Sequence, residues 1–153
     1  MIQLATKLVT EGFKNETDRG GMPYIFHLFR VMHNLQSYDE ELNCIALLHD
    51  AVEDNVLTLT QIHVSFSKRI YDAVELLTHN PDLPHIKYIS YMEYVKKLSH
   101  NLDAVRVKIA DLKDNMDITR LRELTGKDLD RLTKYHIAYK FLVDVLKNKY
   151  NIY

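Results

Sequence analysis

The amino-acid sequence predicts an all-α protein, a compact bundle of about seven to eight helices. Apolar residues recur at helical spacing along nearly the whole 153-residue chain, and alternating apolar and polar runs flanked by turns, which would indicate strands, do not stand out. The chain holds only 4 Gly and 3 Pro while 46% of its residues are hydrophobic, which is typical of a folded globular protein. We therefore expect a single domain over residues 1–153.

Five helices are expected in the first half of the chain. The expected segments are residues 2–9, 23–32, 41–52, a short helix opened by residue 58, and 67–78. Two glycines in the polar stretch 14–21 permit an irregular loop after the first helix. Pro23 suits a first helical turn, and Asp39 is a typical N-terminal cap. Thr58 and Gln61 have the spacing of a capping box.

Three more helices are expected in the second half, over residues 88–98, 102–116 and 128–150. Pro81 and Pro84 bracket a loop that separates them from the fifth helix. Gly126 punctuates the chain before the last helix. The sequence contains no internal repeat and no stretch typical of a domain linker.

The composition argues against several classes of partner. Twenty Lys and Arg against 21 Asp and Glu leave a net charge of -1, so no basic field indicates nucleic acid or a membrane surface. The sequence has neither an apolar run long enough to span a bilayer nor an N-terminal signal pattern, which predicts a cytoplasmic protein. Cys44 is the single cysteine, which excludes an internal disulfide, and its apolar neighbours predict a buried position.

The segment ALLHDAVED, residues 46–54, places four ionisable side chains in an otherwise apolar helix. On a helix His49 and Glu53 lie one turn apart, and so do Asp50 and Asp54, so the four groups form two columns on one face. Burying unpaired carboxylates is costly, and a divalent cation would offset that cost. A metal site is the simplest explanation, although an isolated His-Asp pair is also common on solvated helix faces.

Two further segments supply candidate ligands. GMPYIFH, residues 21–27, ends at His27, and KIADLKDNM, residues 108–116, places Lys108, Asp111 and Asn115 on successive turns of a helix. In order and spacing, the three segments resemble the HD-domain metal-dependent phosphohydrolases. Within that family they resemble the hydrolase domain of the RelA/SpoT homologues and the small alarmone hydrolases, which remove pyrophosphate from (p)ppGpp. The resemblance covers roughly residues 1–140 and implies an HD-domain helical bundle.

The resemblance also implies the metal ligands, which are His27, His49, Asp50 and Asp111. Two nitrogen and two oxygen ligands leave positions for water and substrate, and they suit manganese or magnesium better than a closed structural zinc site. Imidazole also tolerates zinc, iron or nickel, and we favour Mn²⁺ on the precedent of the family. In the resembled enzymes the Glu-Asp pair marks alarmone cleavage, so Glu53 and Asp54 are expected to orient the attacking water and carry its proton.

Six residues at positions that match the family are expected to meet the substrate: Arg19, Tyr24, Lys108, Asn115, Arg131 and Tyr135. For Lys108 and Asn115, support of the metal aspartate is a second interpretation and solvated helix polarity is the alternative. For Arg19 the alternative is a solvated loop arginine, and for Arg131 and Tyr135 it is an exposed arginine over a half-buried tyrosine. The family holds guanine with an Arg-Lys pair, but here Asp18 and Arg19 stand in those positions. A carboxylate at residue 18 is expected to repel phosphates and to weaken guanine selectivity.

Other conspicuous residues receive simpler interpretations. Asp114 and Leu112 depart from the family's usual pattern in the third segment. The remaining histidines lack ligand spacing with the cluster and are expected to be surface or half-buried: His33, His63, His79, His85, His100 and His136. Tyr88 and Tyr91 are expected to pack in a helix, and the mouth of the pocket is the alternative for either.

The expected function is that of a metal-dependent nucleotide phosphohydrolase that removes the 3′-pyrophosphate of (p)ppGpp-type alarmones with a metal-activated water. Two alternatives stay open. One is an HD-family phosphatase for another nucleotide, such as a nicotinamide dinucleotide phosphate or a deoxynucleotide. The other is a non-catalytic HD module that senses a nucleotide or binds a partner protein. The sequence favours an enzyme with a small-molecule nucleotide substrate, because the ligands and the Glu-Asp pair are all present; it leaves the oligomeric state open.

Overall fold

The computed structural model describes residues 1–79 and 91–152. Over these residues the chain forms eight α-helices and one 3₁₀ helix, and its only β-type pairing is an isolated bridge between Thr17 and Pro23. The elements are α1 (Ile2–Gly12), α2 (Ile25–Asn34), α3 (Glu40–Leu48), α4 (Leu59–Ser65), α5 (Lys68–Leu77), α6 (Tyr91–Leu98), α7 (Leu102–Asn115), η1 (Ile118–Arg120) and α8 (Gly126–Tyr150). The prediction of an all-α bundle is confirmed.

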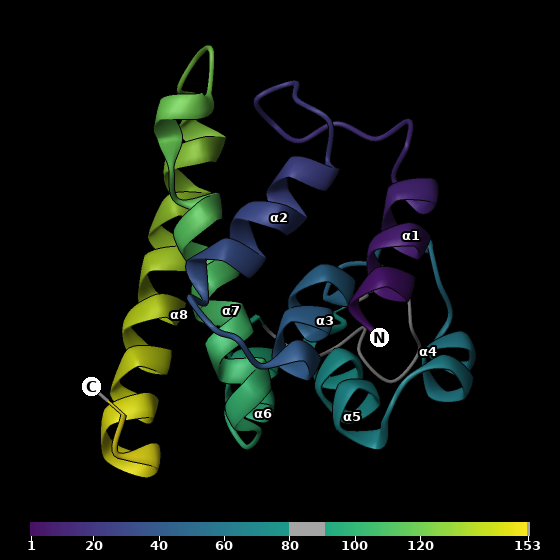
Figure 1. Ribbon diagram of the computed structural model, residues 1–153. Helices are drawn as coiled ribbons and strands as arrows, with labels where there is room; N and C mark the ends of the chain where they lie inside the picture. Colours follow the sequence, from purple (N-terminus) through teal and green to yellow (C-terminus); the bar gives the residue numbers. More distant parts are fainter. Residues whose placement is uncertain (80–90, 153) are drawn as a thin grey trace.

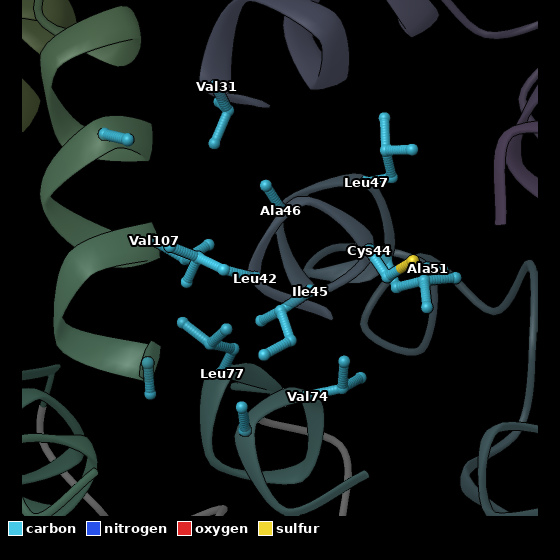
Figure 2. Packing of buried hydrophobic residues seen from close by; sticks show 14 of the residues in the cluster. Val31, Leu42, Cys44, Ile45, Ala46, Leu47, Ala51, Val74, Leu77 and Val107 are labelled. Carbon is cyan, nitrogen blue, oxygen red and sulfur yellow. The ribbon is translucent and has the colours of Figure 1, made fainter. Parts of the chain in front are cut away.

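Helix α3 is the centre of the core. It packs against α1, α2, α5 and α7 and lies in the middle of the bundle in Figure 1. Figure 2 shows Leu42 and Ile45 of α3 among Val107 of α7 and Leu77 of α5, and all four are buried. Cys44 is fully buried beside them, as the sequence predicted. Each such large apolar side chain contributes about 1.5 to 3 kcal/mol to the free energy of unfolding.

Helix α8 is the longest helix described and runs along α7 on the outside of the bundle (Figure 1). It begins at Gly126, two residues before the expected start, because a capping box forms between Thr125 and Asp128. The connection between α7 and α8 lies at the same end of the bundle as the loop between α1 and α2 (Figure 1). None of the described helices is long and apolar enough to cross a membrane.

The predicted third helix is too long. Helix α3 ends at Leu48, and residues 49–55 continue as turns, with Asn55 in the left-handed region at φ 58°. The backbone N–H groups of Val56 and Leu57 both donate to the carbonyl of Ala51, which folds the chain back on itself. The expectation of two regular columns on one helix face is therefore wrong, although the backbone N–H of residue 54 still donates to the carbonyl of residue 50.

The other boundary signals had mixed outcomes. The caps at Asp39 and Thr58 are confirmed by hydrogen bonds from the first turns of α3 and α4. Pro23 lies just outside α2 instead of in its first turn, because it takes part in the bridge with Thr17. The expected loop at 80–84 and the expected start of the sixth helix at 88–90 fall outside the described residues, as do His85 and Tyr88.

Candidate metal centre and substrate cavity

A cavity of about 900 Å³ opens between the loop before α2, the turns after α3, and helices α7 and α8. Its lining includes all the candidate site residues named from the sequence except His49, which is buried. The cavity therefore brings together side chains that are as many as 116 positions apart, from Arg19 to Tyr135. A pocket of this size is large enough for a nucleotide.

Four side chains converge on one point beside the cavity. His27 comes from α2, His49 and Asp50 from the turns directly after α3, and Asp111 from α7. The Nε2 atom of His49 lies 3.0 Å from Oδ2 of Asp50 and 3.6 Å from Oδ1 of Asp111. The Nε2 atom of His27 lies 3.4 Å from each of the same two oxygens.

This arrangement fits a cation. The Nδ1–H of His49 donates to the carbonyl of Ala46 at 2.8 Å, which leaves the lone pair of Nε2 facing the carboxylates. Among the described residues this buried Nε2 has no hydrogen-bond partner. One ligand atom each from His27, His49 and Asp111 lies within 4.8 Å of the others. A buried acceptor aimed at carboxylates is costly without a positive charge between them, so the cluster indicates a divalent metal site.

The electrostatics of the cluster agree with this conclusion. Burial lowers the pKa of His49, but the charges of Asp50 and Asp111 outweigh it and raise the pKa to about 9. Burial also lowers the pKa of His27, but Asp111, Asp114 and Asp50 outweigh it and raise this pKa well above its ordinary value. The carboxylates thus favour positive charge at both imidazoles, and a metal ion would supply that charge in place of protons.

Three further side chains hold the carboxylates of the cluster. The hydroxyl of Tyr24 donates to Oδ2 of Asp50 at 2.6 Å. Lys108 is almost buried and donates to Oδ2 of Asp111 at 2.8 Å, while Asn115 donates to Oδ1. Lys108 and Asn115 therefore make the contacts of the second interpretation, since they support the aspartate of the cluster.

Glu53 and Asp54 line the cavity next to the cluster. The backbone N–H of His79 donates to Oε2 of Glu53 at 2.9 Å. Burial raises the pKa of Glu53 to about 7, with a further contribution from the charge of Asp50. The same two causes raise the pKa of Asp54 to about 6. Carboxylates that titrate near neutral pH are suited to accept and release a proton.

Another part of the cavity lining is basic and aromatic. Arg19 donates to Asp128, and Nη1 of Arg131 lies 3.9 Å from the same carboxylate. The ammonium of Lys134 lies 4.6 Å from the ring centroid of Tyr91 and 5.4 Å from that of Tyr135. The lining thus combines a carboxylate-rich cluster with the cationic side chains of Arg19, Arg131 and Lys134, which is suited to a ligand with several phosphates.

Several lining residues were missed by the sequence analysis. Lys134 lies one turn after Arg131 on α8, so the helical spacing could have predicted that both side chains lie on the same face. His79 is half-buried as expected, but it also lines the cavity and stacks on Tyr94 at 4.4 Å. Tyr91 lines the cavity, which is the alternative considered for it. Arg120 reaches the cavity from η1, and no local spacing indicated its position.

Asp18 corrects one expectation. Its carboxylate accepts hydrogen bonds from the backbone of Gly20 and Met22, and its Oδ2 lies 3.0 Å from Nη2 of Arg30 and 2.8 Å from Nη1 of Arg120. The two guanidinium groups neutralise the carboxylate, and the side chain of Asp18 is buried, with only 6% of it exposed. The expected repulsion between Asp18 and substrate phosphates is therefore wrong.

Comparison with known proteins gives relatives of one kind. No protein-family model matches the chain. The chain is 32% identical over 120 residues to the guanosine-3′,5′-bis(diphosphate) 3′-pyrophosphohydrolase of Aquifex aeolicus (strain VF5), a match that covers 76% of this chain and 17% of that protein. It is 31% identical over 124 residues to the guanosine-3′,5′-bis(diphosphate) 3′-pyrophosphohydrolase MESH1 of Mus musculus, covering 77% of this chain and 68% of MESH1. The chain thus spans about a sixth of the Aquifex protein and about two thirds of MESH1.

A solved structure has the same fold. It belongs to a metazoan ortholog of SpoT described as hydrolyzing ppGpp and acting in starvation responses, and it matches with a TM-score of 0.75 at 22% identity, over 96% of this chain and 85% of that one. The fold and the His/Asp cluster together define an HD-domain protein. The chain belongs to the family of guanosine-3′,5′-bis(diphosphate) 3′-pyrophosphohydrolases that includes MESH1.

Proposed function

We propose that this protein is a metal-dependent hydrolase that removes the 3′-pyrophosphate of (p)ppGpp-type alarmones. The observation that carries the proposal is the convergence of His27, His49, Asp50 and Asp111 beside Glu53, at a cavity that is also lined by arginine and lysine side chains. The names of both sequence relatives support the substrate. We also propose that the domain extends over residues 1–153 and that the protein is cytoplasmic.

The cluster residues hold the metal in this proposal, and Mn²⁺ is the ion that we favour for two imidazoles and two carboxylates. When bound, such a cation lowers the pKa of a water molecule and polarises a phosphoryl oxygen. Glu53 takes the proton from the attacking water, with its carboxylate held by the backbone of His79. Asp54, more exposed and also shifted toward neutral pH, passes the proton to solvent.

The cationic and aromatic side chains of the cavity bind the phosphates and the nucleoside of the substrate. Arg19, Arg131 and Lys134 are placed to meet phosphate oxygens, and the rings of Tyr91 and Tyr135 provide apolar surface for the nucleoside. Since Asp18 is committed to two arginines, Arg19 is left without the second base-binding group of the family pattern. We therefore propose a weaker preference for guanine over adenine than the family pattern implies.

One experiment tests the proposal against its alternatives. Metal-stripped protein is reloaded with Mn²⁺ and given ppGpp, pppGpp, ppApp, NADPH and deoxynucleoside triphosphates, and pyrophosphate and orthophosphate are measured separately. The proposal expects metal-dependent pyrophosphate release from the guanosine compounds. Orthophosphate from NADPH, or turnover of a deoxynucleotide alone, would support the phosphatase alternative. Tight ppGpp binding with no turnover would indicate a non-catalytic sensor.

A further inference from the structure

Four side chains of alternating charge form a closed ring next to the His/Asp cluster: Asp18, Arg30, Asp114 and Arg120. Arg30 donates to Asp114 through Nε at 2.6 Å and to Asp18 through Nη2 at 3.0 Å. Arg120 donates to Asp18 through Nη1 at 2.8 Å and to Asp114 through Nη2 at 3.2 Å. The two carboxylates are only 6% and 5% exposed, while the side chains of Arg30 and Arg120 are 33% and 23% exposed, so two buried negative charges are compensated by partly exposed guanidinium groups.

One member of the ring, Asp114, also contacts a histidine of the His/Asp cluster. Oδ2 of Asp114 lies 2.7 Å from Nδ1 of His27. A carboxylate that receives hydrogen bonds from two guanidinium groups is an acceptor only, so Nδ1 of His27 carries the proton and donates it. The other ring nitrogen, Nε2, then presents its lone pair to the point between Asp50 and Asp111.

The second histidine is held in the same way by the main chain. The Nδ1–H of His49 donates to the carbonyl of Ala46, and its Nε2 faces the same two carboxylates as that of His27. Both imidazoles thus offer Nε2 to a common point, one through a backbone acceptor and the other through Asp114. Only the contact of Asp114 can be removed by changing a side chain.

We propose that Asp114 is a positioning residue for the metal site: it fixes the tautomer and the ring orientation of His27. The inference rests on the metal-binding part of the proposed function. Outer carboxylates of this kind raise the basicity of a histidine ligand, and their removal weakens metal binding by about 10- to 100-fold.

The same ring also holds the loop before α2, which carries Arg19 and Tyr24. Asp18 accepts hydrogen bonds from the backbone of Gly20 and Met22, which places Arg19 and Tyr24 at the cavity. Because Arg30 and Arg120 each contact both carboxylates, the loop and the ligand His27 are held by one set of ion pairs. The metal ligand and the loop are thereby fixed relative to each other.

Two isosteric variants separate positioning from stability. Asp114→Asn and Asp18→Asn each remove one negative charge from the ring, but only Asp114→Asn alters the partner of His27. Both are expected to lower the melting temperature. For Asp114→Asn we expect Mn²⁺ affinity, measured by calorimetry without substrate, to fall about 10- to 100-fold. For Asp18→Asn it should stay within about fivefold of wild type, as for an ion pair away from the ligands. Equal losses of affinity in the two variants would overturn the proposal.

A measurement on the wild type keeps the proposal testable should Asp114→Asn fail to fold. In protein loaded with diamagnetic Zn²⁺, nitrogen-15 NMR of the His27 ring should show a protonated Nδ1 that exchanges slowly with solvent. A protonated Nε2 on His27 would overturn the proposal. Because neither measurement uses turnover, the outcome is distinguishable from that of the proposed function: metal binding without hydrolysis of ppGpp refutes the function and leaves the positioning role intact.

Discussion

The carboxylate of Glu53 accepts a hydrogen bond from the backbone N–H of His79 at 2.9 Å. The contact joins the turns that follow α3 to the residue just beyond the end of α5. It holds the half-buried carboxylate of Glu53 next to the His/Asp cluster. Burial raises the pKa of this carboxylate to about 7. A backbone donor gives this orientation without a second ionisable side chain, which leaves Glu53 able to exchange a proton.

Glu53→Gln should keep the fold and the bound metal while lowering kcat by roughly a hundredfold or more, since the amide cannot act as a general base. Turnover of ppGpp and metal content are measured on the same preparation. Glu75→Gln, an exposed position on α5, is the matched control and should behave as wild type. A Glu53→Gln variant with wild-type turnover would refute the assigned role.

His49→Ala should lose Mn²⁺ and abolish the rise in melting temperature that Mn²⁺ produces in the wild type, because stabilisation by a ligand requires a site that binds it. Asp111→Ala should behave alike, as it removes a ligand and leaves buried Lys108 unpaired. His63→Ala, at an exposed position on α4, is the control for His49→Ala. Full metal content in His49→Ala would exclude this ligand set.

Lys134→Gln should raise the KM for ppGpp by roughly tenfold and leave kcat nearly unchanged, since a phosphate contact away from the reacting atoms contributes equally to the ground and transition states. Lys140→Gln, exposed on the same helix, provides the control. Steady-state kinetics with ppGpp measure KM and kcat for both variants. A fall in kcat at constant KM would assign Lys134 to the chemical step instead.

Asp18→Arg would restore the family's arginine, and the sequence alone suggests tighter guanine binding. The structure leads to the opposite expectation, because the new guanidinium would face Arg30 and Arg120, with Asp114 as the one carboxylate left in the ring. The melting temperature should fall, by several degrees or more, and the KM for ppGpp should not improve. Thermal denaturation and kinetics are the measurements. A stable variant with a lower KM would show that this loop can rearrange.

The stability of the protein in acid should depend on Asp114. Burial raises the pKa of this carboxyl, but hydrogen bonds with His27 and Arg30 prevail and lower it to about 2, from an ordinary value of 3.8. A depressed pKa in the folded state stabilises the protein above about pH 4, and this contribution is lost as the pH falls toward 2. Urea unfolding between pH 2 and 5 should therefore show a weaker pH dependence in Asp114→Asn than in wild type. Identical slopes would refute the assignment.

Short-range signals made the helices predictable from the sequence. The cap at Asp39 and the capping box of Thr58 and Gln61 depend on residues two or three positions apart, and both form. The expected ligands came instead from the resemblance of three separate segments to one family, and the structure brings the side chains of those segments together. The end of α3 was not predictable, since the continuing apolar pattern hides a turn fixed by backbone hydrogen bonds to Ala51.

By itself, then, the sequence determined the all-α class and most helix boundaries, because periodicity and capping are local properties of the chain. Only the tertiary structure decided how Asp18 is neutralised, which acceptor orients His27, and how Lys134 and His79 reach the cavity. The ring that joins Asp18 to Arg120 spans 102 positions. Such contacts depend on how separate helices pack, and an ion pair leaves no spacing in the sequence when its partners lie on different elements.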